Sequence, residues 1–391
     1  MRKIFIVGAA RTPIGSLNGS LAGVGAVELG KTCVKDSLRR AGVDGTAVDE
    51  VIIGNVLQAG LGQNPARQIA IGCGVLKKSP SFTVNQVCGS GLKAIDLARQ
   101  VILTGNANVV IAGGIESMSG APYILPALRQ GARLGECAAL DIVVSDGLTD
   151  VFGRYHMGIT AENIASRYAV SREAQDRFAL ESQKKYKAAL EKGVFKDEIV
   201  PVTVKQRKAE IVVGVDEHPR PDSTFESLSK LKPAFKPDGT VTAGNSSGIN
   251  DGAASVLLFS EDSALASSAG KVIVRDIACV GCEPELMGMG PVAAINALLS
   301  RQKMHVKDID VWELNEAFAA QSVAVLNELG IDVGIVNVNG GAIALGHPIG
   351  ASGARIVVTL IHQMKRQNAG LGIASLCIGG GMGLAILLEN V

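Results

Sequence analysis

The chain has 391 residues, of which 47% are hydrophobic and 19% charged, and its 38 basic and 37 acidic side chains leave a net charge of +1. This length exceeds one ordinary core and predicts two or three structural units, while the composition is that of a globular α/β protein and excludes a disordered or fibrous chain. A charge near zero gives no overall field toward nucleic acid or an anionic membrane, so neither is expected as a partner.

Short β-branched segments alternate with amphipathic segments along residues 1–117. The opening run IFIV predicts a strand rather than a signal peptide, because Arg11 and Pro13 soon interrupt the apolar stretch. The runs VIIGNV, SFTV and NVVIAGG predict further strands, with helices between them. Such alternation predicts βαβ units and a largely parallel sheet covered by helices. No apolar run approaches the ~18 residues that a membrane-spanning helix needs, so no membrane partner is expected.

Cys88 stands in the segment TVNQVCGSGLKAI, at the turn between a predicted strand and a predicted helix. The ordinary interpretation is a small buried hydrophobe; the functional one is a nucleophilic thiolate at the positive end of a helix dipole. The run GSGLKA also fits the dinucleotide fingerprint G-x-G-x-x-A, with Glu116 near the end of the next strand. Against that alternative, the motif lies far from the opening strand, and the thiol would crowd a pyrophosphate.

Residues 118–247 differ from the preceding segment in composition and pattern, and they predict an inserted lid over the first half. A start rich in Gly and Pro leads to a polar helix with Ser171 as its N-cap and Gly193 at its end. The strand-like segments IVPVTV and EIVVGV then flank a basic loop and predict a hairpin.

Residues 269–391 repeat the alternation of 1–117 in the same order. We interpret this as an internal duplication of a doubly wound unit, the first copy being completed by residues 248–268. The duplication would place His347, in the loop GHPIG, at the position equivalent to the Cys88 turn. Both would then face one crevice, where the histidine could leave a thiolate–imidazolium pair with a pKa well below the ~8.5 of free cysteine.

Two further residues become candidate catalytic groups when they are considered together with Cys88 and His347. Cys377 stands just before three glycines, and by itself it predicts a buried core cysteine. Facing the same crevice, however, a second thiol could move protons, and the glycine N–H groups could hold an oxyanion. Asn315, in LNEAFAA, can donate an amide N–H to a developing negative charge.

The seven cysteines are scattered and odd in number, which favours a reducing compartment, so we expect a cytoplasmic protein. Cys279 and Cys282 form a C-x-x-C pair without a second pair at zinc spacing. We therefore expect two buried thiols and no metal site, a redox role for the pair being the minor alternative.

Four motifs together resemble the thiolases, and most of all their biosynthetic branch: NQVCGSG at 85–91, NEAF at 315–318, GHPIGASGAR at 346–355 and CIGGGMG at 377–383. The likeness covers nearly the whole chain in the family's order, which removes the dinucleotide alternative. It implies an α/β thiolase-like fold, with two duplicated doubly wound αβα halves in a layered αβαβα core plus an inserted lid domain.

The resemblance implies a ping-pong Claisen condensation of two acetyl-CoA to acetoacetyl-CoA plus CoA, and the reverse thiolysis. Cys88 would take the acetyl group, His347 would activate its thiol, and Cys377 would remove an α-proton from the second acetyl-CoA. One oxyanion hole would use His347 and a water held by Asn315; the other would use the backbone N–H groups of Cys88 and Gly379. No cofactor is expected, because the reaction is non-oxidative and CoA enters as part of the substrate.

The family's CoA- and acyl-binding positions map onto Leu148, His156, Met157, Arg220, Ser227, Ala243, Gly244, Ser247, Ile249, Met287, Ala317 and Phe318. Arg220 would partner the adenine-nucleotide end, and the histidine and methionines resemble the short-chain branch. The alternatives are a 3-ketoacyl-CoA thiolase of broader chain length, a decarboxylating ketoacyl synthase and a non-enzymatic acyl-CoA-binding protein. Family members use the region around 125–147 for tetramer contacts, so a homo-oligomer is expected, a tetramer rather than a dimer.

Overall fold

The structure is a computed structural model that describes residues 2–205, 209–263 and 272–391. Part of the predicted basic loop (206–208) and the predicted junction between 248–268 and 269–391 (at 264–271) lie outside the described residues. Among the described residues, no helix is both long and apolar enough to span a bilayer.

A mixed sheet of ten strands runs through the molecule in the order β12-β13-β14-β11-β1-β10-β5-β3-β4, with β2 paired to β10. The prediction of a largely parallel sheet is wrong, because, in the part of the chain that the structure describes, most neighbouring strands pair antiparallel and the parallel ladders are confined to β3, β4 and β5 and to β12 and β13. In the described residues, the ladder between β1 and β11 holds the pairs Phe5–Ile273 and Ile6–Val272, and it joins two half-sheets at their edges. The strands are β1 Ile4–Arg11, β2 Gly15–Ser16, β3 Glu50–Gly54, β4 Ser81–Val84, β5 Val109–Ser117, β10 Asn250–Ser260, β11 Val272–Gly281, β12 Val311–Leu314, β13 Leu371–Ile378 and β14 Met382–Asn390.

The two half-sheets share one topology, which confirms the predicted duplication. In the first half, β5 pairs antiparallel with β10 and parallel with β3, and β4 adds parallel to β3. In the second half, β13 pairs antiparallel with β14 and parallel with β12, and Val336 forms the parallel bridge to Trp312 that corresponds to β4.

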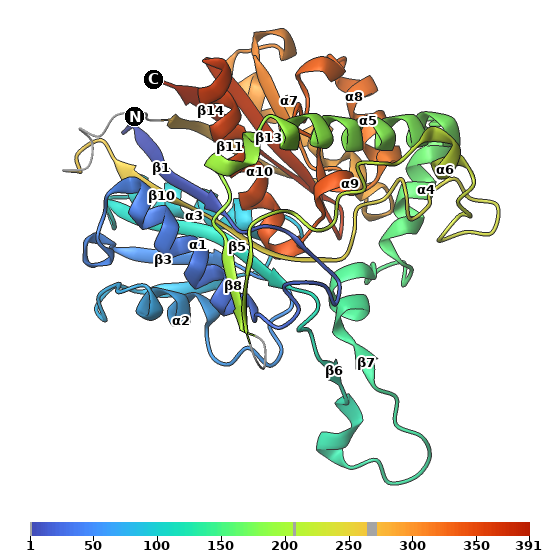
Figure 1. Cartoon of the computed structure of the whole chain (residues 1–391), viewed down its shortest axis with the longest axis horizontal. Coiled ribbons are helices and arrows are strands. Elements are labelled where there is room, and N and C mark those ends of the chain that lie inside the picture. Colours follow the sequence, from blue (N-terminus) through green and yellow to red (C-terminus); the bar gives the residue numbers. More distant parts are fainter. Residues whose placement is uncertain (1, 206–208, 264–271) are drawn as a thin grey trace.

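Helices divide the core into five layers, as predicted. The central cluster packs α3 and α10 between both half-sheets, α1 and α2 cover the outer face of the first half, and α7 and α8 cover the second. Figure 1 shows the first half in blue to cyan and the second in orange to red. These helices are α1 Ala26–Ala41, α2 Pro65–Gly72, α3 Ser90–Leu103, α7 Gly290–Gln302, α8 Ala319–Leu329, α9 Ala342–Leu345 and α10 Ile349–Gln367.

Small residues let the two central helices approach closely. A Cβ added at Gly91 would lie 2.7 Å from the backbone nitrogen of Ala354, and one added at Gly353 would lie 2.5 Å from that of Leu92. Because α3 and α10 begin at the Cys88 and His347 loops, this contact brings the two loops together.

Residues inserted within the first copy, before β10, form the predicted lid helix and hairpin. Ser171 caps α5 by accepting the N–H of Ala174, and Gly193, with φ 69°, follows its end. The hairpin pairs β8 with β9, and an arm carrying β6 and β7 projects from the body of the molecule (Figure 1). These elements are β6 Tyr123–Ile124, β7 Leu140–Asp141, α4 Met157–Arg167, α5 Arg172–Glu191, β8 Val202–Lys205, β9 Glu210–Val213 and α6 Phe225–Ser229.

The seven cysteines are all free thiols. The expected burial of the C-x-x-C pair is wrong for Cys279, which is exposed, while Cys282 is partly buried. Cys279 takes an outward-facing position near the end of β11, where its sulfur accepts a hydrogen bond from Nε2 of Gln86 at 3.3 Å.

Candidate active site

Cys88 sits on a tight turn between β4 and α3. The preceding residue, Val87, has φ 48°, an uncommon conformation for a β-branched residue, and its N–H donates to Oδ1 of Asn85. Ser90 closes the turn by donating its hydroxyl to the Val87 carbonyl at 2.7 Å. A Cβ on Gly89 would lie 2.5 Å from Cδ1 of Ile378 on β13, so any larger residue here would force that side chain to shift. The turn thus presents the thiol directly before the start of a helix.

His347 lies in the equivalent loop of the second half, just before α10, and is 5% exposed. Its backbone N–H donates to Oδ1 of Asn250 at 2.8 Å, and its Nδ1 lies 2.5 Å from Oγ of Ser352. Nε2 is buried without a hydrogen-bond partner in the part of the chain that the structure describes. One ring nitrogen, Nδ1, is therefore hydrogen-bonded to the protein, while Nε2 is available for proton transfer.

Asn315 follows β12 and is 1% exposed. Its N–H donates to the carbonyl of Ser375 on β13, while both polar atoms of its side-chain amide lack a partner among the described residues. The neighbouring Glu316 is by contrast fully engaged, because its carboxylate accepts from Ser182, Asn337 and the N–H of Ile343. A buried amide without partners is costly, which is typical of a group that awaits a ligand or water.

Cys377 is fully buried near the end of β13. It packs in a cluster with Met157, Met287, Ala317 and Phe318. Burial raises the pKa of its thiol, and the nearby Cys88 raises that pKa further. The two sulfurs are thus close enough to interact electrostatically across the junction of the halves.

Cys88 and His347 both line a cavity of about 350 Å³. Its wall includes Cys88, His347 and Gly379, together with residues of the lid. The backbone N–H of Gly379 is directed at Cys88 and lowers the pKa of its thiol. Cys377 and Asn315 are not part of the wall; Cys377 packs directly behind wall residues.

Electrostatics in this cavity differ from the sequence expectation. Burial raises the pKa of Cys88 to about 11, although the Gly379 N–H acts in the opposite direction. Burial also lowers the pKa of His347 to about 3. The predicted thiolate–imidazolium pair is therefore not the resting form. Both charges would be desolvated, so the pocket favours a neutral thiol beside a neutral imidazole.

Most of the residues predicted to bind CoA lie along this cavity. The wall contains Leu148, His156, Met157, Arg220, Ala243, Ser247, Ile249, Met287, Ala317 and Phe318. Two predicted positions lie off it: the Ser227 hydroxyl bonds within the cap of α6, and Gly244 packs against Leu228 and Leu231.

Sequence reasoning missed two large wall residues, Phe235 and His218. The Phe235 ring stacks on His156, with centroids 4.6 Å apart, and meets Phe318 edge-on at 6.1 Å. Burial, helped by the charge of Arg220, lowers the pKa of His218 to about 4. In the sequence each of these residues stands near a proline in a loop, and this pattern does not predict that its side chain lines a cavity.

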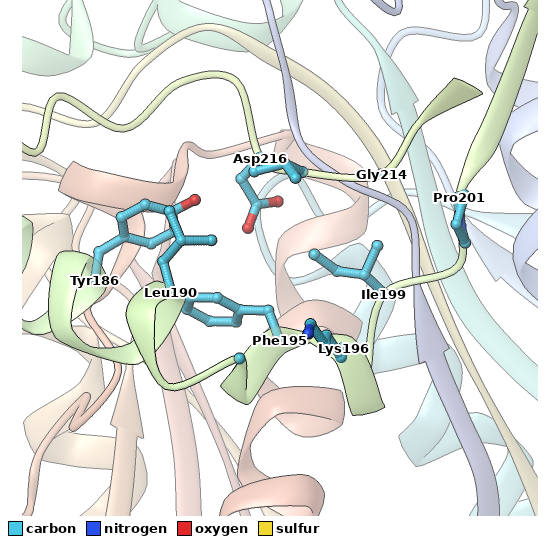
Figure 2. A pocket seen from close by; sticks show the side chains of 10 residues that line it. Tyr186, Leu190, Phe195, Lys196, Ile199, Pro201, Gly214 and Asp216 are labelled. Atoms are coloured by element: carbon cyan, nitrogen blue, oxygen red, sulfur yellow. The ribbon is translucent and has the colours of Figure 1, made fainter. Parts of the chain in front are cut away.

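A second cavity, of about 300 Å³, is lined by residues of the lid segment 118–247 and contains none of the predicted site residues (Figure 2). Tyr186 and Phe195 dominate its mostly apolar wall. Its one carboxylate, Asp216, is already bound by the guanidinium of Arg11 at 2.7 Å and by the N–H of Ile14. The acid of this cavity is therefore already paired.

Comparisons with known proteins agree with this geometry. Residues 4–262 match the model described as Thiolase, N-terminal domain, and residues 269–390 match Thiolase, C-terminal domain. An acetyl-CoA acetyltransferase of Chromobacterium violaceum is 54% identical over 99% of this chain and all of its own length, and one of Escherichia coli is 53% identical over the full length of both.

Two solved structures superpose closely on the chain. The acetyl-CoA acetyltransferase of Bacillus anthracis has a TM-score of 0.97 at 44% identity, covering 100% of this chain and 99% of its own. Human mitochondrial 3-ketoacyl-CoA thiolase in complex with CoA has a TM-score of 0.95 at 42% identity, covering 100% and 98%.

Proposed function

The chain belongs to the thiolase family, and we propose that it is an acyltransferase that condenses two acetyl-CoA into acetoacetyl-CoA and CoA, and catalyses the reverse thiolysis. One observation carries the assignment of roles. Two loops from duplicated halves bring Cys88 and His347 to one cavity, with a second thiol, Cys377, packed directly behind its wall.

In the first half-reaction, Nε2 of His347 takes the thiol proton of Cys88 as the sulfur attacks the thioester carbonyl. The N–H of Gly379 is directed at Cys88 and can therefore donate a hydrogen bond to the oxyanion that develops there. The tetrahedral intermediate collapses, and the departing CoA sulfur takes the proton of Cys377. The products are acetyl-Cys88, imidazolium and the Cys377 thiolate, with CoA leaving as the thiol.

In the second half-reaction, the Cys377 thiolate removes the α-proton of a new acetyl-CoA. Burial raises the pKa of Cys377, which makes its thiolate the strong base that a weakly acidic α-proton requires. The Nε2–H of His347 and a water on the Asn315 amide would stabilise the enolate oxygen. The carbanion attacks acetyl-Cys88, and the released thiolate recovers its proton from the imidazolium, so both thiols and the imidazole return to their starting forms.

We also propose that the enzyme prefers short acyl chains. Met157 and Met287 are buried around Cys377, and the Phe235 ring stands beside them. Bulky side chains at the closed end of an acyl site restrict chain length. The likeness to human 3-ketoacyl-CoA thiolase favours the alternative of broader chain length, and a series of 3-ketoacyl-CoA substrates separates the two.

The assembly and location belong to the proposal as well. The projecting arm exposes apolar side chains, among them Tyr123, Leu128 and Leu134, the last 99% exposed. Such a surface supports contact with further copies of the chain, and we propose a tetramer. Free, scattered cysteines support the cytoplasm.

Intact-mass analysis after incubation with acetyl-CoA tests the chemistry. We expect one acetyl group per chain in the wild type and none in Cys88→Ser. Cys377→Ala should still take up acetyl, more slowly because the departing CoA loses its proton donor, but it should lose condensation altogether. Cys73→Ser, a change at a distant thiol, should behave as wild type. Condensation at the wild-type rate by Cys88→Ser would refute the mechanism, and equal loss of both half-reactions in Cys377→Ala would remove its role as base.

A further inference from the structure

Among the residues that the structure describes, the ring of His347 has one side-chain partner, the hydroxyl of Ser352, at 2.5 Å from Nδ1. Ser352 is 1% exposed and lies one turn into α10, directly behind the histidine loop. Its hydroxyl also lies 2.9 Å from the carbonyl of Pro348, in a geometry suited to donation. Within the described part of the chain no carboxylate accepts from the ring, in contrast to the usual arrangement of a catalytic histidine.

A hydroxyl has one proton, so the direction of these hydrogen bonds fixes the tautomer of the imidazole. If Nδ1 carries the proton, it donates to Ser352, and the serine donates in turn to Pro348, which gives two bonds in a chain. If Nε2 carries the proton, the serine must donate to Nδ1 instead. Only one bond is then made, and a buried N–H is left without a protein partner. The first arrangement is favoured, because bonds in a chain strengthen one another and unpaired buried donors are costly.

We propose that Ser352 is a positioning residue that holds His347 as the Nδ1–H tautomer, so that the lone pair of Nε2 faces the catalytic cavity. The inference deepens the proposed function and rests on it, because it assigns the starting state from which His347 accepts the Cys88 proton. Ser352 does not touch the substrate and acts only through the histidine.

Neighbouring groups agree with this assignment. Asn250 fixes the histidine backbone rather than the ring, since it accepts the N–H of His347. Glu116 accepts the N–H of Gly350 and the side-chain amide of Asn55, so it holds the start of α10 rather than the imidazole. A neutral serine partner leaves the imidazolium without a compensating charge. The histidine therefore rests as a neutral base and is charged only while Cys88 carries the acetyl group.

The tautomer can be observed without any turnover. In protein labelled with ¹⁵N-histidine, the signals of His347 are assigned by their loss in His347→Asn, and the two ring nitrogens of a neutral imidazole are then distinguished by their shifts. We expect a protonated Nδ1 and a bare Nε2 in the wild type and in Ser352→Thr, which keeps the hydroxyl. In Ser352→Ala the Nδ1–H loses its acceptor, so the preference for that tautomer should be lost and the share of Nε2–H should rise.

The kinetic arm follows acetylation of Cys88 by rapid mixing and mass analysis. Ser352→Ala should slow this step by about 10- to 100-fold, the usual cost of removing a group that orients a functional histidine, and Ser352→Thr should restore most of the rate. The matched control is Ser322→Ala, because Ser322 is also a buried helical serine whose hydroxyl donates to a carbonyl four residues back, that of Phe318 at 3.1 Å. It should acetylate as wild type.

A bare Nδ1 in the wild type would overturn the proposal, as would an unchanged tautomer and acetylation rate in Ser352→Ala. The wild-type spectrum decides the matter even if the alanine variant does not fold. A wild-type protein that takes up no acetyl group would instead refute the proposed function. The ¹⁵N shifts of His347 would still show which ring nitrogen carries the proton.

Discussion

Replacing Gly158 by alanine should destabilise the protein although the substitution lies in a helix. Gly158 is the second residue of α4, where alanine is ordinarily better than glycine by about 0.5–1 kcal/mol. An added Cβ, however, would lie 2.2 Å from Cγ of Phe235. Carbon atoms pack at about 3.5 Å or more, so the ring must move by more than about 1 Å.

The ring cannot move freely, because it stacks on His156 and meets Phe318 edge-on. Overpacking of this kind costs about 1–3 kcal/mol, which exceeds the gain in helix propensity. We therefore expect Gly158→Ala to lower the free energy of unfolding by about 1–2 kcal/mol. It should also raise KM for acetyl-CoA, because the displaced ring forms part of the cavity wall.

Urea unfolding of four proteins measures the effect: wild type, Gly158→Ala, Phe235→Ala and the double variant. With the ring removed, the new methyl group has no clash, so the same Gly158→Ala change should now stabilise the protein by about 0.5–1 kcal/mol. The sign of the substitution thus reverses between the two backgrounds. An equal effect in both would show that the ring yields without cost and would refute the reasoning.

Three further predictions concern the core, a buried acid and the acyl site. Gly383→Ala should cost more than about 4 kcal/mol or prevent folding, since its Cβ would lie 1.9 Å from the backbone oxygen of Gly290, whereas Gly281→Ala, with its nearest contact at 3.8 Å, should be nearly neutral in the same thermal melts. Burial raises the pKa of Glu116 to about 7 from 4.5, so the stability it contributes is present at low pH and is lost as the pH rises through 7. Glu116→Gln should flatten the fall in unfolding free energy between pH 5 and 8, and an unchanged slope would contradict this. Met287→Ala should widen the acyl site and raise kcat/KM for a six-carbon 3-ketoacyl-CoA relative to acetoacetyl-CoA by about 10-fold or more, and an unchanged ratio would exclude Met287 from chain-length selection.

The amino-acid sequence determined the architecture and the reacting groups. Alternating β-branched and amphipathic runs predicted the duplicated halves, because strand and helix periodicities are local properties of a chain. The lid helix began and ended as predicted at Ser171 and Gly193, whose capping chemistry acts over a few residues. The motif residues Cys88 and His347 could be named because glycines and proline mark their turns.

Tertiary structure alone decided the wall of the cavity and its electrostatics. Phe235 and His218 come from lid loops whose sequence does not say what they will face, and Cys279 proved exposed where burial was expected. The charge state of Cys88 also could not be read from its turn. A helix N-terminus favours the thiolate, yet desolvation by residues distant in sequence outweighs it. A pKa depends on everything within several ångströms of a group, and only the folded chain determines what lies there.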